Sequence, residues 1–251
     1  MSSGTAGPLR PVEPPLRSVD DLALRHGLVD GGRGLAALLE LVAVDPTAPT
    51  SVRDRGAILR DHLADSLAAL ELDQVAGATE VADIGSGGGF PGLPLALALP
   101  HARVSLIEAN GRKCEFIARA IAACGVPNAR AVHARAESWG EGLGRCDLVT
   151  ARALAPLPVL AEYAAPLLRC GGVLVAWRGR RDREDEVAGA LAGAELGLEP
   201  GPVVEVRPYP GALHRHLHVL TKTRDTPGRF PRRPGMALKR PLAPPSDRSR
   251  R

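Results

Sequence analysis

The chain has 251 residues, of which 45% are hydrophobic and 24% charged, as in an ordinary globular protein with one core. Aromatic residues make up only 3%, which argues against RNA-binding modules that stack several bases on aromatic rings. No run of about 18 apolar residues occurs, and the N-terminus lacks an export signal. We therefore expect no membrane span and a cytoplasmic location. The four cysteines form no C-x-x-C pair, so we expect reduced thiols rather than a zinc site.

The net charge of +4 hides an uneven distribution along the chain. Residues 207–251 contain 12 basic and 2 acidic residues, whereas residues 1–206 contain 20 basic and 26 acidic residues. An acidic body with a basic C-terminal end indicates either a polyanionic partner or a solvated tail. Charge alone does not decide between these two interpretations.

The first part of the chain predicts a leader followed by helices. Residues 1–19 contain four prolines and no apolar period, so we expect a disordered leader. One compact domain is expected over residues 20–223, beginning with helices near residues 22–28, 35–42 and 55–72.

From residue 80 onward, short apolar runs alternate with helical periods, which is the pattern of a parallel sheet with crossover helices. The expected parallel strands are Val81–Ile84, Val104–Glu108, Ala129–His133, Asp147–Thr150 and Val173–Trp177. Two further runs, Val203–Arg207 and Leu213–Thr223, are close enough to pair as an antiparallel hairpin. The sequence therefore predicts an α/β fold, a doubly wound and mostly parallel sheet with a C-terminal antiparallel strand.

The first strand is followed by a glycine-rich loop, Gly85–Gly89, that leads into a helix. Glycines at such a turn let the backbone approach a ligand closely. Gly87, Gly89 and Gly92 fit the dinucleotide pattern G-x-G-x-x-G, so a dinucleotide-dependent oxidoreductase is one interpretation.

Three features favour S-adenosylmethionine as the cofactor. Asp83 suits the cationic amino group of a methionine moiety better than a pyrophosphate. An antiparallel strand that closes a parallel sheet is typical of the methyltransferase variant of this fold. No tyrosine–lysine pair at the spacing of a dehydrogenase occurs, because Leu167 and Leu213 stand four residues after the two tyrosines.

The loop sequence Asp83–Gly92, which ends in Phe-Pro-Gly, resembles the cofactor loop of the RsmG/GidB family. These bacterial methyltransferases form 7-methylguanine in 16S ribosomal RNA. Five further blocks agree in order: His62–Leu67, Arg135–Glu137, Ala151–Ala153, Phe230–Gly235 and Lys239–Leu242. The resemblance implies the class I S-adenosylmethionine-dependent methyltransferase fold, an rRNA (guanine-7-) methyltransferase activity, and 16S ribosomal RNA or the small ribosomal subunit as partner. Residues 1–49 do not match.

The resemblance also implies which residues bind S-adenosyl-L-methionine. Its matching positions are Gly85, Phe90, Ala136, Glu137 and Arg152. Gly87 belongs to the same loop, and Glu108 ends the second strand, where a carboxylate can accept both ribose hydroxyls. We expect Ala136 and Glu137 to read the adenine edge, and Arg152 to bind the methionine carboxylate or a phosphate.

Methylation of guanine N7 needs no general base, because that nitrogen carries a lone pair and no proton. We therefore assign no catalytic residue and expect catalysis by positioning. His62 and Asp65, three residues apart on a helix, favour a structural hydrogen-bonded pair over a catalytic one. His214, His216 and His218 alternate along one strand, but no cysteine or carboxylate joins them, so no metal is expected. A non-enzymatic RNA-binding assembly factor that keeps the fold remains a further alternative.

The end of the chain, residues 224–251, predicts an irregular basic tail, because it is rich in proline and arginine. Arg232, Arg233, Lys239 and Arg240 are the expected RNA-binding residues. This tail need not enter the cofactor pocket if it lies along RNA. The competing interpretation is that it only fixes the last strand to the core.

Overall fold

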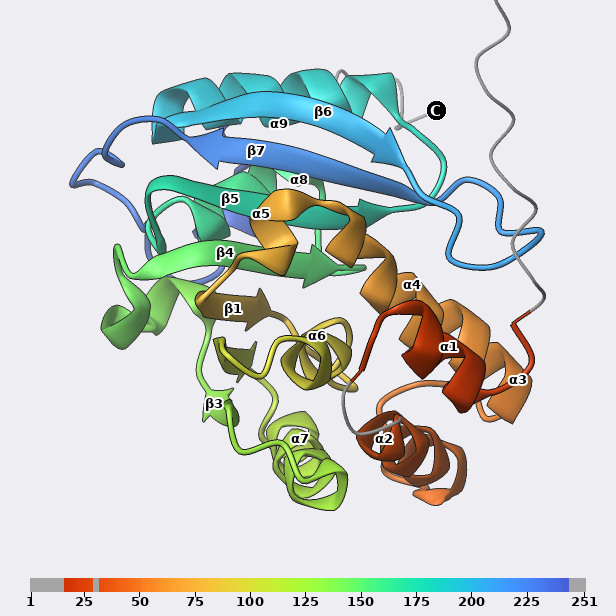
Figure 1. Cartoon of the computed structure of the whole chain (residues 1–251). Helices are drawn as coiled ribbons and strands as arrows, with labels where there is room; N and C mark the ends of the chain where they lie inside the picture. The colour runs from red at the N-terminus through yellow and green to blue at the C-terminus, as the bar shows by residue number, and fades with distance from the viewer. Residues whose placement is uncertain (1–15, 29–31, 244–251) are drawn as a thin grey trace, which may run out of the picture.

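The computed structural model describes residues 16–28 and 32–243, and its centre is a seven-stranded sheet with the order β3-β2-β1-β4-β5-β7-β6 (Figure 1). The strands are β1 (Glu80–Ile84), β2 (Arg103–Glu108), β3 (Ala129–His133), β4 (Cys146–Arg152), β5 (Leu168–Arg178), β6 (Leu198–Glu205) and β7 (His216–Lys222). All neighbouring pairs among β1–β5 are parallel, whereas β7 is antiparallel to both β5 and β6. The predicted fold class is confirmed.

The strand order reverses between β1 and β4. From β1 the chain adds β2 and then β3 on one side, and it returns to place β4 on the other side of β1. Ligands of open α/β sheets bind at such a reversal, outside the carboxyl ends of the strands. The topology therefore directs attention to the segments that follow β1, β2 and β4.

Helices cover both faces of the sheet (Figure 1). One face packs against elements from the N-terminal part of the chain: α1 (Val19–Arg25), α2 (Arg33–Val44), α3 (Arg55–Ala57), η1 (Ile58–Ala64), α4 (Asp65–Leu67), η2 (Ala68–Glu71), α5 (Asp73–Ala76), α6 (Gly92–Ala98) and α7 (Gly111–Cys124). The other face packs against η3 (Ala136–Ser138), η4 (Gly140–Gly142), α8 (Leu157–Ala164), α9 (Arg183–Leu196) and α10 (Met236–Lys239).

Two hydrophobic cores follow from the alternation of side chains along the strands. On β2, for example, Leu106 belongs to the core beneath α2, α6 and α7, and the next residue, Ile107, belongs to the core beneath α8 and α9. Both are buried, with at most 1% of their surface exposed. The two helix layers hold the sheet between them, and the sheet in turn fixes the positions of the carboxyl ends of its strands.

The predicted helix over residues 55–72 is a continuous helical segment from Arg55 to Glu71, but its middle, η1, is π-helical. π-Helical turns are frequent at functional sites, and η1 contains Asp61 and His62. Helices α1 and α2 occupy the places of the two short predicted ones. Most of the predicted leader, residues 1–15, lies outside the described residues. Its last residues are ordered, since Ser18 caps α1 and accepts a hydrogen bond from the Asp21 amide.

The edge strand β6 begins five residues earlier than the prediction at Val203. Helix α9 ends at Gly197, whose φ of +82° is a left-handed C-cap, and β6 starts at the next residue. Pro200 and Gly201 indicate a loop in the sequence. The structure accommodates them in an edge strand, where the register with β7 shifts between Pro200 and Val203. In the described part of the chain no helix has the length and apolar character to cross a bilayer.

Candidate functional site

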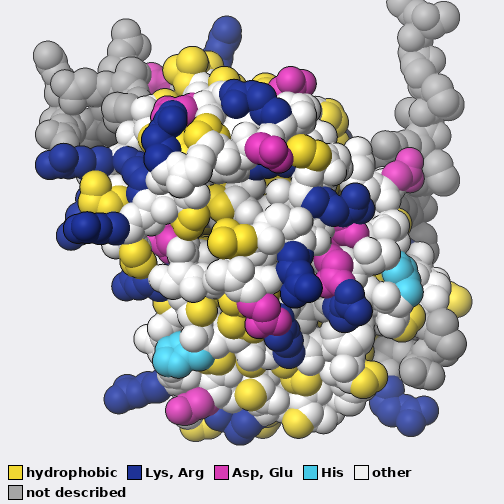
Figure 2. All heavy atoms as spheres, turned by 90° about the vertical axis from the view of Figure 1, so that its left-hand side faces the viewer, with side chains coloured by type: hydrophobic (Ala, Val, Ile, Leu, Met, Phe, Trp, Pro, Cys, Tyr) yellow, Lys and Arg dark blue, Asp and Glu magenta, His cyan; other side chains and the backbone are white. Residues whose placement is uncertain are grey.

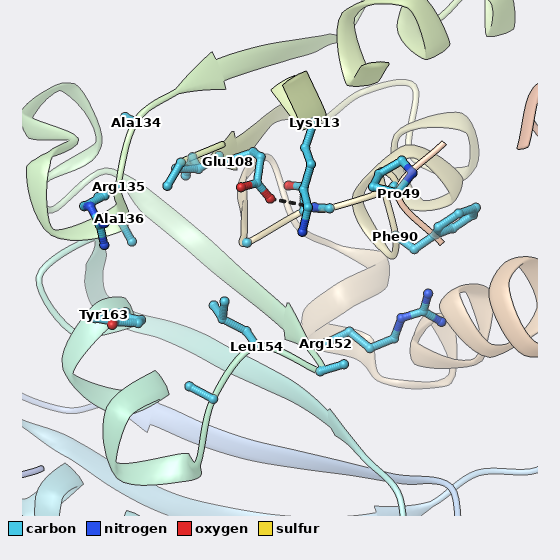
Figure 3. A pocket seen from close by; sticks show the side chains of 18 of the residues that line it. Pro49, Phe90, Glu108, Lys113, Ala134, Arg135, Ala136, Arg152, Leu154 and Tyr163 are labelled. Atoms are coloured by element: carbon cyan, nitrogen blue, oxygen red, sulfur yellow. Dashed lines mark hydrogen bonds between the residues drawn. The ribbon is translucent and has the colours of Figure 1, made fainter. Parts of the chain in front are cut away.

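A cavity of about 390 Å³ lies at the carboxyl ends of β1, β2 and β4 (Figure 3). Its lining comes from the glycine loop after β1, from Glu108 at the end of β2, from the segment after β3 and from the segment after β4. The sequence-predicted cofactor residues that line it are Gly85, Gly87, Phe90, Glu108, Ala136, Glu137 and Arg152. The structure thus brings together residues that are up to 67 positions apart.

Glu108 is held in the cavity by backbone groups. Its Oε2 accepts a hydrogen bond from the Gly87 amide at 3.0 Å, which Figure 3 shows as a dashed line, and its Oε1 accepts one from the Asn110 amide at 2.8 Å. Only 8% of Glu108 is exposed. Such a fixed carboxylate at the end of the second strand is placed as a ribose-binding residue would be.

Asp83 does not line the cavity, which corrects the expectation that its carboxylate meets the cofactor's amino group. Only 1% of it is exposed, and burial raises the pKa of its carboxyl group to about 6. Oδ1 accepts a hydrogen bond from the Thr150 hydroxyl, and Oδ2 accepts one from the Gly92 amide. Asp83 therefore joins β1 to β4 and to the start of α6. A Cβ at Gly92 would lie 2.8 Å from Oδ2, so that glycine permits the close packing.

The far end of the cavity, beyond β3, is lined by Ala136, Glu137 and Tyr163 (Figure 3 labels Ala136 and Tyr163). Burial raises the pKa of the Tyr163 hydroxyl to about 12, so it stays protonated as a possible hydrogen-bond donor. Glu137 Oε1 accepts a hydrogen bond from the Gly235 amide at 2.9 Å, and Leu238 also lines the cavity. The C-terminal segment therefore reaches this cavity, contrary to the expectation that it stays outside.

At the near end, Arg152 points toward Phe90 (Figure 3), and its guanidinium carbon lies 5.4 Å from the centre of that ring. Arg152 donates to Asp65 Oδ2 and to the Asp61 carbonyl, both at 3.0 Å, and to His62 Nδ1 at 3.3 Å. The sequence suggested a hydrogen bond between His62 and Asp65. In the described residues these two do not bond to each other, and Arg152 bonds to both. Burial and the Arg152 charge lower the pKa of His62, so its ring is neutral near pH 7.

A second cavity, of about 540 Å³, adjoins the first. The two share His62, Arg152 and Ala153 in their linings. Trp177 lines the second cavity together with two ion pairs, Asp185 with Arg178 and Asp61 with Arg215. No pattern in the sequence indicates this cavity. Its residues come from η1, the end of β5, the start of α9 and β7, and no local pattern connects them.

The histidines of the last strand do not come together. His216 Nδ1 contacts the Gly179 carbonyl, His218 is buried, and His214 lies beside Arg180. Across the described residues, no three His, Cys, Asp or Glu side chains are arranged as a set of metal ligands.

The four predicted RNA-binding residues fall into two groups. Arg232 forms a two-pronged ion pair with Glu162, which is only 1% exposed, and donates to the Arg240 carbonyl at 2.9 Å. This favours a structural role for Arg232. The side chains of Arg233, Lys239 and Arg240 are exposed and form no hydrogen bond or ion pair with any residue that the structure describes. RNA contact stays a prediction for these three.

Comparison with known proteins identifies the family to which this site is related. Residues 46–199 match the model of the family described as rRNA small subunit methyltransferase G. The chain is 43% identical over 196 residues to ribosomal RNA small subunit methyltransferase G of Rubrobacter xylanophilus, covering 76% of this chain and 75% of the relative. It is 44% identical over 202 residues to the protein of the same name from Chloroflexus aggregans, covering 77% and 82%.

Among solved structures, a SAM-dependent methyltransferase from Aquifex aeolicus superposes with a TM-score of 0.52. It covers 74% of this chain and 97% of its own, at 16% identity. At that identity the likeness extends to the fold alone.

Proposed function

Since the chain belongs to the rRNA small subunit methyltransferase G family, we propose that it transfers the methyl group of S-adenosylmethionine to ring nitrogen 7 of a guanine in 16S ribosomal RNA, in the cytoplasm. One observation carries this proposal. The cavity that collects the cofactor residues adjoins a second cavity, and His62, Arg152 and Ala153 lie at their junction. A methyl donor and an acceptor base need such adjoining sites.

The residues of the first cavity fit S-adenosylmethionine. Glu108 would accept the ribose hydroxyls, and the segment Ala136–Glu137 would bind the adenine edge. Gly85 and Gly87 permit close backbone approach of the methionine part, with φ values of +68° and +55° that favour glycine. The volume of about 390 Å³ lies in the range of small-molecule sites. The cofactor supplies an electrophilic methyl group on a sulfonium ion.

The second cavity would hold the guanine, with N7 directed at the junction. Transfer forms the N7–carbon bond with the nitrogen lone pair, while the sulfur–carbon bond breaks and its electrons return to sulfur as a thioether. No proton moves. The guanine ring gains positive charge, and Asp182, a carboxylate in the lining of the second cavity, would stabilise it electrostatically, whereas Asp61 is already paired with Arg215.

His62 would act as a positioning residue rather than as a base. Its Nε2 lies 3.1 Å from the Thr50 hydroxyl, its Nδ1 accepts from Arg152, and its ring centre lies 4.8 Å from that of Phe90. Both ring nitrogens are thus occupied, and the ring is held against Phe90 at the junction of the two cavities.

The basic C-terminal residues Arg233, Lys239 and Arg240 would contact phosphates of the RNA. Figure 2 shows the face at the amino ends of the parallel strands, which is opposite the cavities. There Lys and Arg side chains are intermingled with acidic and hydrophobic ones. Charge therefore does not mark that face as the RNA-binding surface, and the proposal places RNA on the side of the cavities.

Mass-spectrometric mapping of 16S ribosomal RNA from cells with and without this protein tests the reaction. We expect one 7-methylguanine to disappear with the protein; an unchanged pattern would refute the proposal. Thermal-shift assays with S-adenosylhomocysteine and with NAD separate it from an oxidoreductase, and an assembly factor without activity would leave the RNA unmodified.

The positioning mechanism has its own test. Single-turnover methyl transfer should be nearly independent of pH between about pH 6 and 9, because N7 has no proton to lose. If the rate instead rises with pH as a single group loses its proton, and this rise is absent in His62→Ala, the reaction uses a general base.

A further inference from the structure

The C-terminal segment, residues 230–240, is built into the wall of the cofactor cavity. Phe230 is 8% exposed, and Ala237 is 2% exposed, within the core beneath α8. The ion pair of Arg232 with Glu162 attaches the segment to α8, and the Gly235 amide attaches it to Glu137. These contacts make the segment part of the domain rather than a free tail.

Leu238 is the side chain of this segment that lines the cavity. It is 54% exposed, although the preceding residue, Ala237, is buried. An exposed leucine at the rim of a binding cavity gains free energy when a ligand covers it. Because Gly235 contacts Glu137 at the same end, Leu238 is placed to cover the adenine part of the cofactor.

Exposed basic residues flank Leu238 in the same segment. Lys239 follows Leu238 directly and is the last residue of α10, Arg240 is the C-cap of α10, and Arg233 precedes the turn. The turn is closed by hydrogen bonds from the Lys239 amide to the Gly235 carbonyl and from the Arg240 amide to the Met236 carbonyl. These bonds link Leu238 to its basic neighbours within one turn, so a ligand held by those neighbours would bear on the position of Leu238.

We propose that this segment couples the two ligands of the enzyme: Leu238 closes the adenine end of the cofactor cavity, and RNA bound by Arg233, Lys239 and Arg240 holds it closed. The inference rests on the proposed function, because it takes 16S ribosomal RNA as the polyanion. Coupling is reciprocal by thermodynamic necessity, so the cofactor must tighten RNA binding by the same factor by which RNA tightens cofactor binding.

The first experiment measures the affinity for S-adenosylhomocysteine by calorimetry, without RNA. Leu238→Ala should weaken binding by about three- to tenfold, as expected for apolar area withdrawn from a bound ligand. Leu191→Ala is the matched control, since Leu191 is 62% exposed on α9 and does not line the cavity. Equal affinities for these two variants would overturn the role of Leu238.

The second experiment measures binding of a 16S ribosomal RNA transcript with and without saturating S-adenosylhomocysteine. The wild-type protein should bind the transcript about fivefold more tightly, or better, when the cofactor product is present. The triple variant Arg233→Gln/Lys239→Gln/Arg240→Gln should lose this factor and bind RNA more weakly, yet keep its affinity for S-adenosylhomocysteine in the absence of RNA.

The coupling is overturned if S-adenosylhomocysteine does not change the RNA affinity of the wild type. It is also overturned if S-adenosylhomocysteine raises the RNA affinity of the triple variant as much as that of the wild type. If the proposed function is wrong, the result is different: the wild-type protein does not bind S-adenosylhomocysteine at all. That result refutes the proposed function and the coupling together. Melting temperatures confirm that each variant is folded.

Discussion

Two adjacent arginines, Arg232 and Arg233, allow the structural and RNA-binding roles of the C-terminal segment to be separated. Arg232 is 24% exposed and pairs with the nearly inaccessible Glu162, whereas Arg233 is exposed and makes no such contact with a described residue. We therefore expect Arg232→Gln to destabilise the fold and Arg233→Gln to leave its stability unchanged.

The magnitude follows from the charge that Arg232→Gln would leave behind. Removing one partner of a buried ion pair costs about 3–5 kcal/mol, because the other charge stays buried without compensation. Since Arg232 is partly exposed, we expect the lower end, about 3 kcal/mol. For a chain of this size that lowers the melting temperature by roughly 6–12 °C.

The assay is thermal unfolding, together with the salt dependence of RNA binding. Arg233→Gln should keep its melting temperature and reduce the slope of log affinity against log salt by about 0.7. In the Arg232→Gln background, Glu162→Gln should restore part of the lost stability, because it removes the unpaired charge. An Arg232→Gln protein that melts like the wild type would refute this reasoning.

Two further predictions concern Asp83 and the glycine loop that follows it. The raised pKa of Asp83 means that its contribution to stability is complete below about pH 3.8 and is lost as pH rises through about 6. In urea unfolding, the free energy of unfolding of the wild type should therefore fall by up to about 3 kcal/mol between pH 4 and 7, relative to that of Asp83→Asn. If the difference between the two proteins does not change with pH, Asp83 is not a buried carboxyl group that titrates in this range. Gly85→Val should weaken S-adenosylmethionine binding more than tenfold in calorimetry. It should also lower the melting temperature more than Gly87→Ala does, because a Cβ at Gly85 would lie 2.5 Å from Leu154, whereas one at Gly87 has no neighbour closer than 3.8 Å. Unchanged affinity would show that the loop does not bind the cofactor.

The sheet and most of the first cavity are predictable from the sequence because their signals are local. Buried parallel strands are short apolar runs, and glycines at a strand-to-helix turn mark a close backbone approach. Glu108 could be placed for the same reason, since it ends such a run. Once the strands are assigned, topology alone brings their carboxyl ends together.

The sequence is least informative where contacts join distant parts of the chain. Asp83 looks like a cofactor ligand in the sequence, but Thr150 and the Gly92 amide take up its carboxylate inside the fold. Arg232 looks like one more basic tail residue, because its partner, Glu162, is 70 positions away. Leu238 has no pattern that distinguishes it, and only the path of the last segment across α8 brings it to the cavity.

The position of Leu238 has a consequence for how the protein is made. The cofactor cavity takes residues from Pro49 at one extreme to Leu238 at the other, so most of the chain contributes to one small-molecule site. Domains generally fold as units, and the seven strands and the glycine loop all precede residue 238 in the chain. A nascent chain that stops short of this residue would have an incomplete cavity, open at the adenine end. Completion of the cofactor cavity therefore depends on nearly the whole of the described chain.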